Sequence, residues 1–342
     1  MTVNPISGFK SLETHHCITG SILHIYTYNN YEISEDMLLG LGSGMGFIYW
    51  HVKGTQPFIG GRVNIERPGF DGLEKTLGRR TGVNVESFRT SSARKAEKTL
   101  LDLLDANEPV MLQVDMGYLP YLDLPEDFHF GYHVIVAAGY NPVSRQVLIA
   151  DRDKDLHVIS VDELDHARGS KFKPFPPQYA WWTYDFSIAH PPKPEDILLA
   201  IREVSIGMVD PPVSNFGVKG IRKTAHRVLK WPEIMENDEL RWTCFNTFNF
   251  IDAMGGTGGG IFRYMYSRFL KEAAVLTGEG RLEEIGGMVR ELGDRWQEVA
   301  CIFKRAAVKG EDPKEILPET TAPLLEIADR EEQVWERLLK IV

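Results

Sequence analysis

Cys17, His133 and Asp151 are the residues whose types and order in the chain best fit thiol-based acyl chemistry. A cysteine thiolate attacks a carbonyl carbon, a histidine accepts and returns the proton, and a carboxylate fixes the orientation and tautomer of the imidazole. We therefore predict a Cys-His-Asp catalytic site. In it Cys17 is the nucleophile, His133 is the base and later the acid, and Asp151 orients His133.

The sequence around Cys17 predicts a helix that carries the thiol in its first turn. Ile18, Ile22 and Ile25 recur at i, i+4 and i+7, which is the spacing of one helix face. Unpaired backbone N–H groups and the positive end of the helix dipole stabilise a thiolate at this position. The alternative is a buried cysteine that serves only as a small apolar residue.

His133 and Asp151 lie at the ends of two consecutive strand-like runs, 133–140 and 146–150. An antiparallel hairpin centred near residue 143 would place His133 opposite Asp153, so that both aspartates come within reach of the imidazole. We prefer Asp151 because it follows the second strand directly, and Asp153 is the alternative. Considered singly, a histidine or aspartate at a strand end is usually a turn or surface residue.

The elements that must position these residues divide into an N-terminal α+β part and a helical C-terminal part. A helix over 91–106 leads into a strand at 110–114, and a further strand is expected over 180–186. The proline-rich segment 190–194, which follows this strand, resembles a stiff linker, so we predict domains at 1–190 and 191–342. The second domain is expected to hold helices near 195–208, 217–230, 236–252, 260–277, 280–308 and 323–341.

Length and composition fit a cytoplasmic enzyme. A chain of 342 residues with 43% hydrophobic content exceeds the size at which one core usually stops growing, so two cores are expected. Three widely separated cysteines form neither a disulfide framework nor a metal cluster and indicate a reducing compartment. The N-terminus lacks the features of a signal peptide, and no apolar run approaches the length of a membrane span. A net charge of −10 argues against a nucleic-acid partner.

Several further segments, taken together, resemble the sequence of a known protein family. They are the glycine-rich segment 35–47, Gly60-Gly61-Arg62, the run from Pro109 to Asp115, and the glycine run from Gly255 to Gly260. With the segments around Cys17 and His133, those before residue 170 resemble the N-terminal domain of the butirosin-biosynthesis protein H family. The remainder resembles the helical domain of unknown function that often follows it.

This resemblance implies a fold, an activity and a set of partners. The fold would be similar to papain-like cysteine peptidases, with Cys17, His133 and Asp151 in the catalytic positions. The family's named member is an acyltransferase of butirosin biosynthesis that moves an acyl group from the phosphopantetheine thioester of a carrier protein to an aminoglycoside amine. We therefore expect secondary-metabolite biosynthesis, an acyl carrier protein or other acyl-thioester donor, a small-molecule amine acceptor and no cofactor of the protein's own. The aminoglycoside itself does not carry over.

One departure from papain-like peptidases concerns the oxyanion hole. Those enzymes commonly place a Gln a few residues before the nucleophile, but residues 10–16 contain none. The backbone N–H of Cys17 remains one candidate donor, and Thr14, His15 or His16 could supply the second. Losing such a donor costs on the order of 10²–10³ in rate, so a catalyst of this type needs a replacement.

Four residues are candidates for substrate contact: His16, Gln113, Tyr118 and Arg263. Gln113 ends a predicted strand, Tyr118 lies in an aromatic and proline-rich loop, and Arg263 follows a glycine run at a helix N-terminus that suits a pantetheine phosphate. Ordinary packing or turn roles are the alternatives. The basic segment 219–227 is the best candidate for docking an acidic carrier protein, with a solvated helix face as its alternative.

Three functions are compatible with these residues. The first is an acyltransferase that forms an acyl-cysteine and passes the acyl group to an amine. The second is a cysteine peptidase or amidase that uses the same residues but delivers the acyl group to water. The third is a non-catalytic binding module that retains the fold. We favour the first because of the family resemblance, and a homo-oligomer remains open.

Overall fold

The computed structural model describes residues 3–125 and 127–342, which divide into two compact units. The first unit extends to Leu38 and resumes over Gly82–His190, and the second contains Leu39–Thr81 and Pro191–Val342. The division at residue 190 coincides with the boundary expected from the prolines. The assignment of residues 39–81 to the second unit makes both units discontinuous, which a single boundary does not anticipate.

The first unit is built on a six-stranded sheet in which neighbouring strands are antiparallel. In spatial order the strands are β3 (Asn84–Phe88), β8 (Trp181–Asp185), β4 (Val110–Val114), β5 (His133–Asn141), β6 (Gln146–Ala150) and β7 (Leu156–Ser160). β4 is buried at all five positions, as expected of a strand with neighbours on both edges and helices on its faces.

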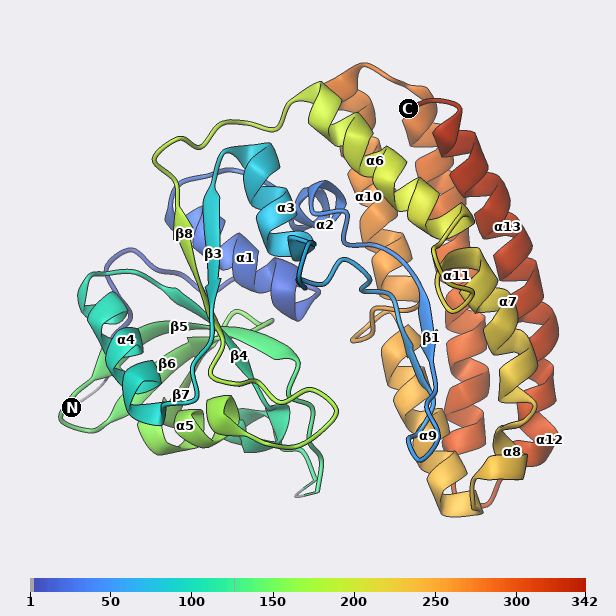
Figure 1. Cartoon of the computed structure of the whole chain (residues 1–342), viewed down its shortest axis with the longest axis horizontal. Helices are drawn as coiled ribbons and strands as arrows, with labels where there is room; N and C mark the ends of the chain where they lie inside the picture. The colour runs from blue at the N-terminus through green and yellow to red at the C-terminus, as the bar shows by residue number, and fades with distance from the viewer. Residues whose placement is uncertain (1–2, 126) are drawn as a thin grey trace. The chain divides into compact units, whose positions relative to one another are not determined.

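Three helices cover this sheet. α1 (Cys17–Tyr28) and α4 (Ala93–Asp105) pack against β4 and β5, and α5 (Val161–Gly169) packs against β4 and β7. Figure 1 shows α1 on one side of the sheet and α5 on the other. The predicted apolar face of α1 is confirmed, because Ile18, Ile22 and Ile25 are each at most 2% exposed.

The β5–β6 hairpin contains a bulge that sets the register at its open end. Near the turn Asn141 faces Gln146, whereas farther from the turn Val136 faces Ala150. The one-residue change in register falls at Ala138. Val136 and Ala150 are equidistant from residue 143, so the predicted centre of the hairpin is confirmed at its open end. At the turn Asn141 pairs with Gln146, and this pair is centred half a residue farther along the chain.

This bulge decides on which face Asp151 emerges. Continuing the register beyond the strand end puts Asp151 opposite Ile135, diagonal to His133 and on the same face of the sheet. If the register of the turn had continued instead, Asp151 would oppose Val136 and point to the other face.

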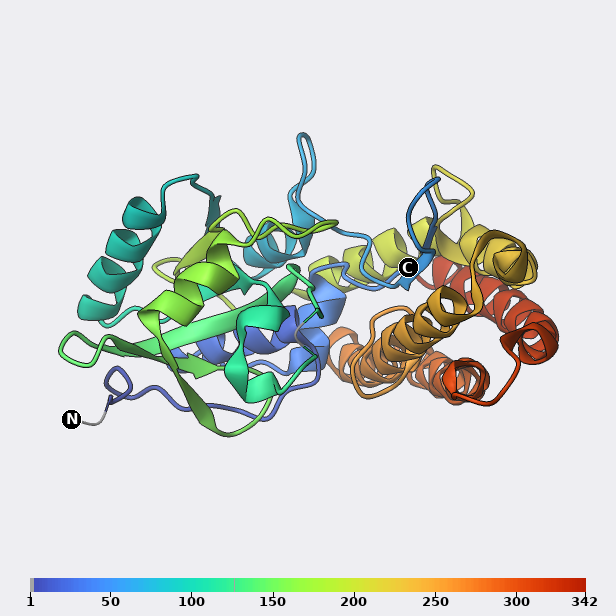
Figure 2. The same cartoon turned by 90° about the horizontal axis from the view of Figure 1, so that it is seen from below.

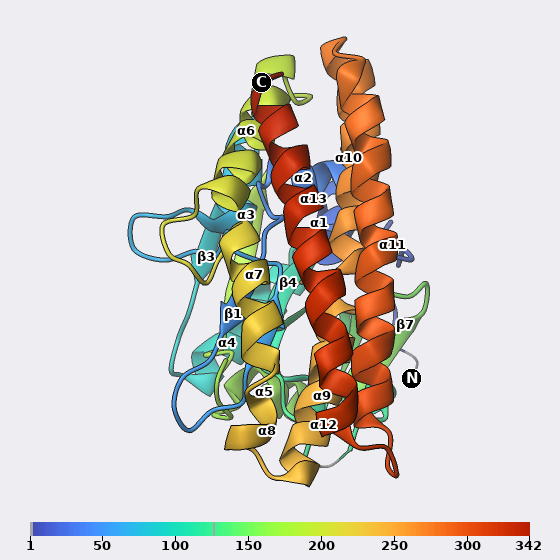
Figure 3. The same cartoon turned by 90° about the vertical axis from the view of Figure 1, so that its right-hand side faces the viewer.

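The second unit is mostly helical, as predicted, and the α+β class is confirmed for the chain. Its long helices lie side by side in Figures 2 and 3. They are α6 (Pro194–Val209), α7 (Gly217–Val228), α9 (Asn237–Ile251), α10 (Gly260–Thr277), α11 (Arg281–Ala307) and α13 (Thr321–Leu339). Shorter segments complete the bundle: α8 (Trp231–Ile234), α12 (Pro313–Ile316) and η3 (Leu317–Thr320). Among the described residues, no helix is long and apolar enough to cross a membrane.

The inserted segment 39–81 belongs to this unit because it is bonded to its helices. It contains the two-stranded β1–β2 pair (Ile48–Trp50 and Phe58–Gly60) and α3 (Gly72–Thr81). Buried Arg80 at the end of α3 forms an ion pair with Glu203 of α6 at 2.8 Å. A Cβ on Gly61 would come within 1.7 Å of the carbonyl oxygen of Thr257, so the backbone approach there requires glycine.

Candidate active site

The structure brings Cys17, His133 and Asp151 together from three separate elements. Cys17 is the first residue of α1, His133 is the first residue of β5, and Asp151 directly follows β6. The thiol of Cys17 is hydrogen-bonded to His133, and His133 Nε2 lies 2.8 Å from Asp151 Oδ2. Because Nε2 of His133 is hydrogen-bonded to Asp151, Nδ1 is the ring nitrogen that can exchange a proton with the thiol.

The three groups shift one another's pKa values. Burial raises the pKa of the Cys17 thiol, but electrostatic interactions and hydrogen bonds with His16 and His133 outweigh it and hold the pKa well below that of an ordinary cysteine. Burial lowers the pKa of His133, but Asp151 and Cys17 raise it overall. Burial raises the pKa of Asp151, and His133 lowers it overall. These shifts favour a thiolate beside an imidazolium at neutral pH.

Tyr121 is a further member of the site that the sequence analysis does not identify. It lies in the short 3-10 helix η2 (Pro120–Leu122), and its hydroxyl donates to Asp151 Oδ2 at 3.0 Å. Its ring stacks on His157 with centroids 4.0 Å apart, and His157 Nε2 lies 3.0 Å from Asp153 Oδ2. Asp153 is therefore engaged by His157, and the carboxylate in contact with His133 is Asp151. The only sequence signal for Tyr121 was the aromatic loop that contains it.

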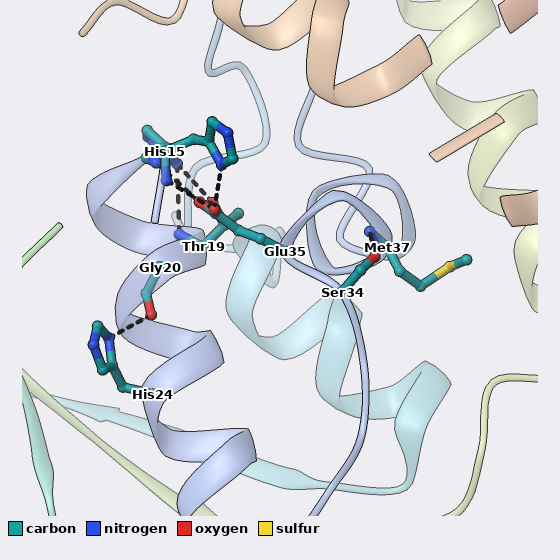
Figure 4. A network of polar contacts seen from close by, with 8 residues as sticks. His15, Thr19, Gly20, His24, Ser34, Glu35 and Met37 are labelled. Atoms are coloured by element: carbon teal, nitrogen blue, oxygen red, sulfur yellow. Dashed lines mark hydrogen bonds and ion pairs between the residues drawn. The ribbon is translucent and has the colours of Figure 1, made fainter. Parts of the chain in front are cut away.

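Glu35 organises the backbone that leads into α1, as Figure 4 shows. This carboxylate, 7% exposed, accepts from the backbone N–H groups of His15 at 2.8 Å and His16 at 2.9 Å. It also accepts from the hydroxyl of Thr19 at 2.8 Å and contacts His15 Nδ1 at 3.0 Å. Burial raises the pKa of Glu35, but these hydrogen bonds lower it overall, so the carboxylate is ionised at neutral pH. Nothing in the sequence links Glu35 to the residues before Cys17.

Two hydrogen bonds of His24 hold its imidazole between α1 and the segment that precedes Cys17. His24 Nδ1 lies 2.8 Å from the carbonyl oxygen of Gly20, and its Nε2 accepts from the backbone N–H of Leu12 at 2.9 Å. These partners require a neutral imidazole, and burial lowers the pKa of His24 accordingly. Gly20 itself is needed because a Cβ there would lie 2.3 Å from Thr14 Oγ1.

The expected substrate contacts differ in where the structure places them. His16 is buried beside Cys17, with 5% of its surface exposed. Gln113 faces Val134 across the β4–β5 ladder, so its side chain points to the face opposite that of His133. Its amide donates to the carbonyl oxygen of Gly131 at 2.7 Å, where it holds the segment that enters β5. Tyr118 lies in η1 (Met116–Tyr118) with its ring 5.3 Å from that of His129.

Arg263 requires a correction. It was expected at a helix N-terminus ready for an anionic substrate group, but it is fully buried in the second unit. Its Nε and Nη2 donate to Glu331 at 2.9 and 3.1 Å, and its Nη1 donates to the carbonyl oxygen of Gly258 at 3.0 Å. A guanidinium without solvent access whose donors are engaged by the protein is a structural group. The periodicity of α10 (Gly260–Thr277) gave no indication that this position faces the bundle core.

The basic segment of α7 is also largely neutralised within its own unit. Arg222 forms ion pairs with Asp329 and Glu332, and Lys219 Nζ lies 3.3 Å from Asp210 Oδ1. Paired cations of this kind present less net positive charge than the sequence suggests. The segment therefore gives little support to the carrier-docking role, and the solvated helix face remains the simpler interpretation.

The other two cysteines differ from Cys17 in their surroundings. Burial raises the pKa of Cys244 to about 12, and Cys301 is exposed on α11. Within residues 3–125 and 127–342, no group of three or more His, Cys, Asp or Glu side chains is arranged to hold a metal ion. Cys17 is thus the cysteine whose environment favours the reactive thiolate.

Comparison with protein families gives two matches along the chain. Residues 16–152 match the family described as butirosin biosynthesis protein H, N-terminal, a span that begins at His16 and encloses Cys17, His133 and Asp151. This match covers less than half of the 342 residues, so it shows a similarity of the N-terminal part to that family. Residues 162–338, more than half of the 342, match a domain of unknown function, DUF4872, so the chain belongs to that family.

The order of the two matches confirms the architecture expected from the sequence, an N-terminal domain of the butirosin biosynthesis protein H type followed by a helical domain of unknown function. A match of the N-terminal part to a family named for a biosynthetic pathway is consistent with a biosynthetic enzyme. The comparison with curated proteins gave no match.

Proposed function

We propose that the chain is an acyltransferase of papain-like type, in which Cys17 accepts an acyl group from a pantetheine thioester and passes it to an amine. The observation that carries the proposal is the alignment of Cys17, His133 and Asp151, whose pKa shifts all favour a thiolate and imidazolium pair. The match of residues 16–152 to the butirosin biosynthesis protein H N-terminal family supports a biosynthetic acyl transfer rather than peptide cleavage.

The chemistry needs two steps that share these residues. In the first, Cys17 Sγ attacks the thioester carbonyl, the C–S bond to pantetheine breaks, and His133 gives its proton to the departing thiolate. In the second, an amine attacks the acyl-cysteine, His133 removes a proton from the amine, and Cys17 leaves as a thiolate. The products are an amide and the original state of the site. A peptidase or amidase would use the same first step and admit water in the second.

Intact-mass analysis tests the first step directly. The protein is incubated briefly with a panel of acyl-pantetheine thioesters, and the acyl adduct is measured on the wild type and on Cys17→Ala. We expect an adduct that is abolished by Cys17→Ala and retained by Cys301→Ala, the matched control at the exposed cysteine. The lifetime of the adduct with and without added amines then separates transfer from hydrolysis.

Two outcomes would contradict the proposal. An adduct that persists in Cys17→Ala would place the acyl group on another residue. A wild-type protein that forms no adduct, and whose Cys17 also resists iodoacetamide, would favour the non-catalytic binding module.

A further inference from the structure

Cys17 is flanked by a second histidine, His16, whose environment differs from that of His133. His16 is the N-cap of α1, is 5% exposed and forms a hydrogen bond with the Cys17 side chain. The imidazole of His133 contacts the carboxylate of Asp151, whereas the imidazole of His16 contacts the uncharged Thr19. His16 Nδ1 accepts from the Thr19 backbone N–H at 3.5 Å and lies 3.3 Å from the Thr19 hydroxyl oxygen.

These contacts set the tautomer of His16. The Thr19 hydroxyl donates its proton to Glu35 Oε1 at 2.8 Å, and the Thr19 N–H points to Nδ1. An imidazole whose Nδ1 accepts carries its proton on Nε2 when it is neutral. Glu35 further fixes the backbone of His16 by accepting its N–H at 2.9 Å. His16 is therefore oriented to donate its Nε2–H beside the thiol. Its Nδ1 contacts Thr19, whereas the ring of His133 contacts a carboxylate that supports its role as a base.

The same network leaves the backbone N–H of Cys17 at the start of α1 available. Glu35 takes the N–H groups of His15 and His16, and the His16 ring takes that of Thr19. Among the residues that the structure describes, none accepts from the N–H of Cys17. The N–H of the nucleophile and the Nε2–H of the residue before it are thus two donors at adjacent chain positions.

The other two candidates for a second donor are placed less well. The side chain of His15 is 56% exposed and its Nδ1 is held by Glu35. The hydroxyl oxygen of Thr14 is buried with no polar partner among the described residues and is packed against Gly20. This oxygen has almost no exposed surface and lies against the helix backbone at Gly20, so it is a poorer candidate than His16.

We propose that His16 Nε2–H and the backbone N–H of Cys17 form the oxyanion hole of this site, with Thr19 and Glu35 as positioning residues for His16. The inference deepens the proposed function and rests on it. When Cys17 Sγ attacks the acyl carbonyl, the C=O electron pair moves to oxygen, and the two N–H groups stabilise that oxyanion. The carbonyl re-forms as the leaving group departs, and His16 keeps its proton throughout.

Two reactions of the same thiolate test this assignment. Acylation by p-nitrophenyl acetate passes through an oxyanion, whereas alkylation by iodoacetamide does not. For His16→Ala we expect acylation at a pH where the thiolate is fully formed to fall by about 10²–10³-fold. Alkylation at the same pH should change by less than about threefold, because the nucleophile is intact and the reaction needs no oxyanion donor. His16→Gln, which retains a side-chain N–H, should recover part of the acylation rate.

The matched control is His226→Ala, an exposed histidine on α7 of the second unit, which should leave both rates unchanged. Equal losses of acylation and alkylation in both His16 variants would assign His16 a structural role or an effect on the thiol alone, and would overturn the proposal. Unchanged acylation in His16→Ala would overturn it as well. If the wild type reacts with p-nitrophenyl acetate but with no pantetheine thioester, the proposed function fails and the oxyanion assignment is still decided by this comparison.

Discussion

Replacing Asp151 by Asn tests whether the carboxylate sustains the charged state of Cys17 and His133. Asp151 is 6% exposed, and its Oδ2 lies 2.8 Å from His133 Nε2 and 3.0 Å from the Tyr121 hydroxyl. A hydrogen bond to a charged group contributes about 1.5–3 kcal/mol, roughly twice a neutral one. Asn keeps the shape of the side chain but removes its charge, so the imidazolium loses its main support.

The magnitude follows from this difference. A loss of about 0.75–1.5 kcal/mol, the difference between a charged and a neutral hydrogen bond, corresponds to a roughly 4- to 13-fold decrease in rate. In the wild type Asp151 raises the pKa of His133, and the charge of His133 in turn lowers the pKa of Cys17. In Asp151→Asn the pKa of His133 should fall and that of Cys17 should rise. The reactive thiolate should therefore form only at higher pH.

The assay is the rate of iodoacetamide alkylation of Cys17 as a function of pH. We expect the midpoint of the rate profile to move upward and the rate near neutral pH to decrease by the factor above. Asp153→Asn is the matched control, because Asp153 is paired with His157 at a more exposed position. A midpoint that stays in place or moves downward in Asp151→Asn, or that moves only in Asp153→Asn, would refute the argument and the hairpin register on which it depends.

Two further predictions concern stability and are measured by chemical denaturation. Gly20→Ala should lower the free energy of unfolding by about 1–2 kcal/mol, because the clash of its Cβ with Thr14 exceeds the gain in helix propensity. Glu331→Gln should lower it by about 3–5 kcal/mol, because the buried cation of Arg263 loses its partner.

Each of these predictions has a control at a less constrained site. A Cβ on Gly287, inside α11, meets no atom within 4 Å, so Gly287→Ala should stabilise the protein by up to about 1 kcal/mol. A gain in stability from Gly20→Ala as well would show that Thr14 moves freely. Glu319→Gln breaks an exposed ion pair with Arg305 and should leave the unfolding curve in place. Equal effects of Glu319→Gln and Glu331→Gln would contradict the role given to burial.

Much of the architecture could be predicted because it is encoded locally. The i, i+4, i+7 spacing of Ile18, Ile22 and Ile25 predicts α1, and the six long helices of the second unit lie within a few residues of the predicted ranges. The strands β3 and β7 and the helix α5 were not predicted. β3 pairs with β8, about a hundred residues away, and its short alternating pattern is weak without that partner.

By itself the sequence determined the residue types of the site, the helix that carries Cys17 and the hairpin that carries His133, because periodicity and turn chemistry act between near neighbours. Only the tertiary structure decided that Asp151 and not Asp153 contacts His133, since the bulge at Ala138 puts Asp151 on the face of His133 and His157 engages Asp153. It also brought Tyr121 and Glu35 to the site and buried Arg263 against Glu331. Such contacts depend on packing between distant segments, and no local pattern records which distant side chain will satisfy a buried polar group.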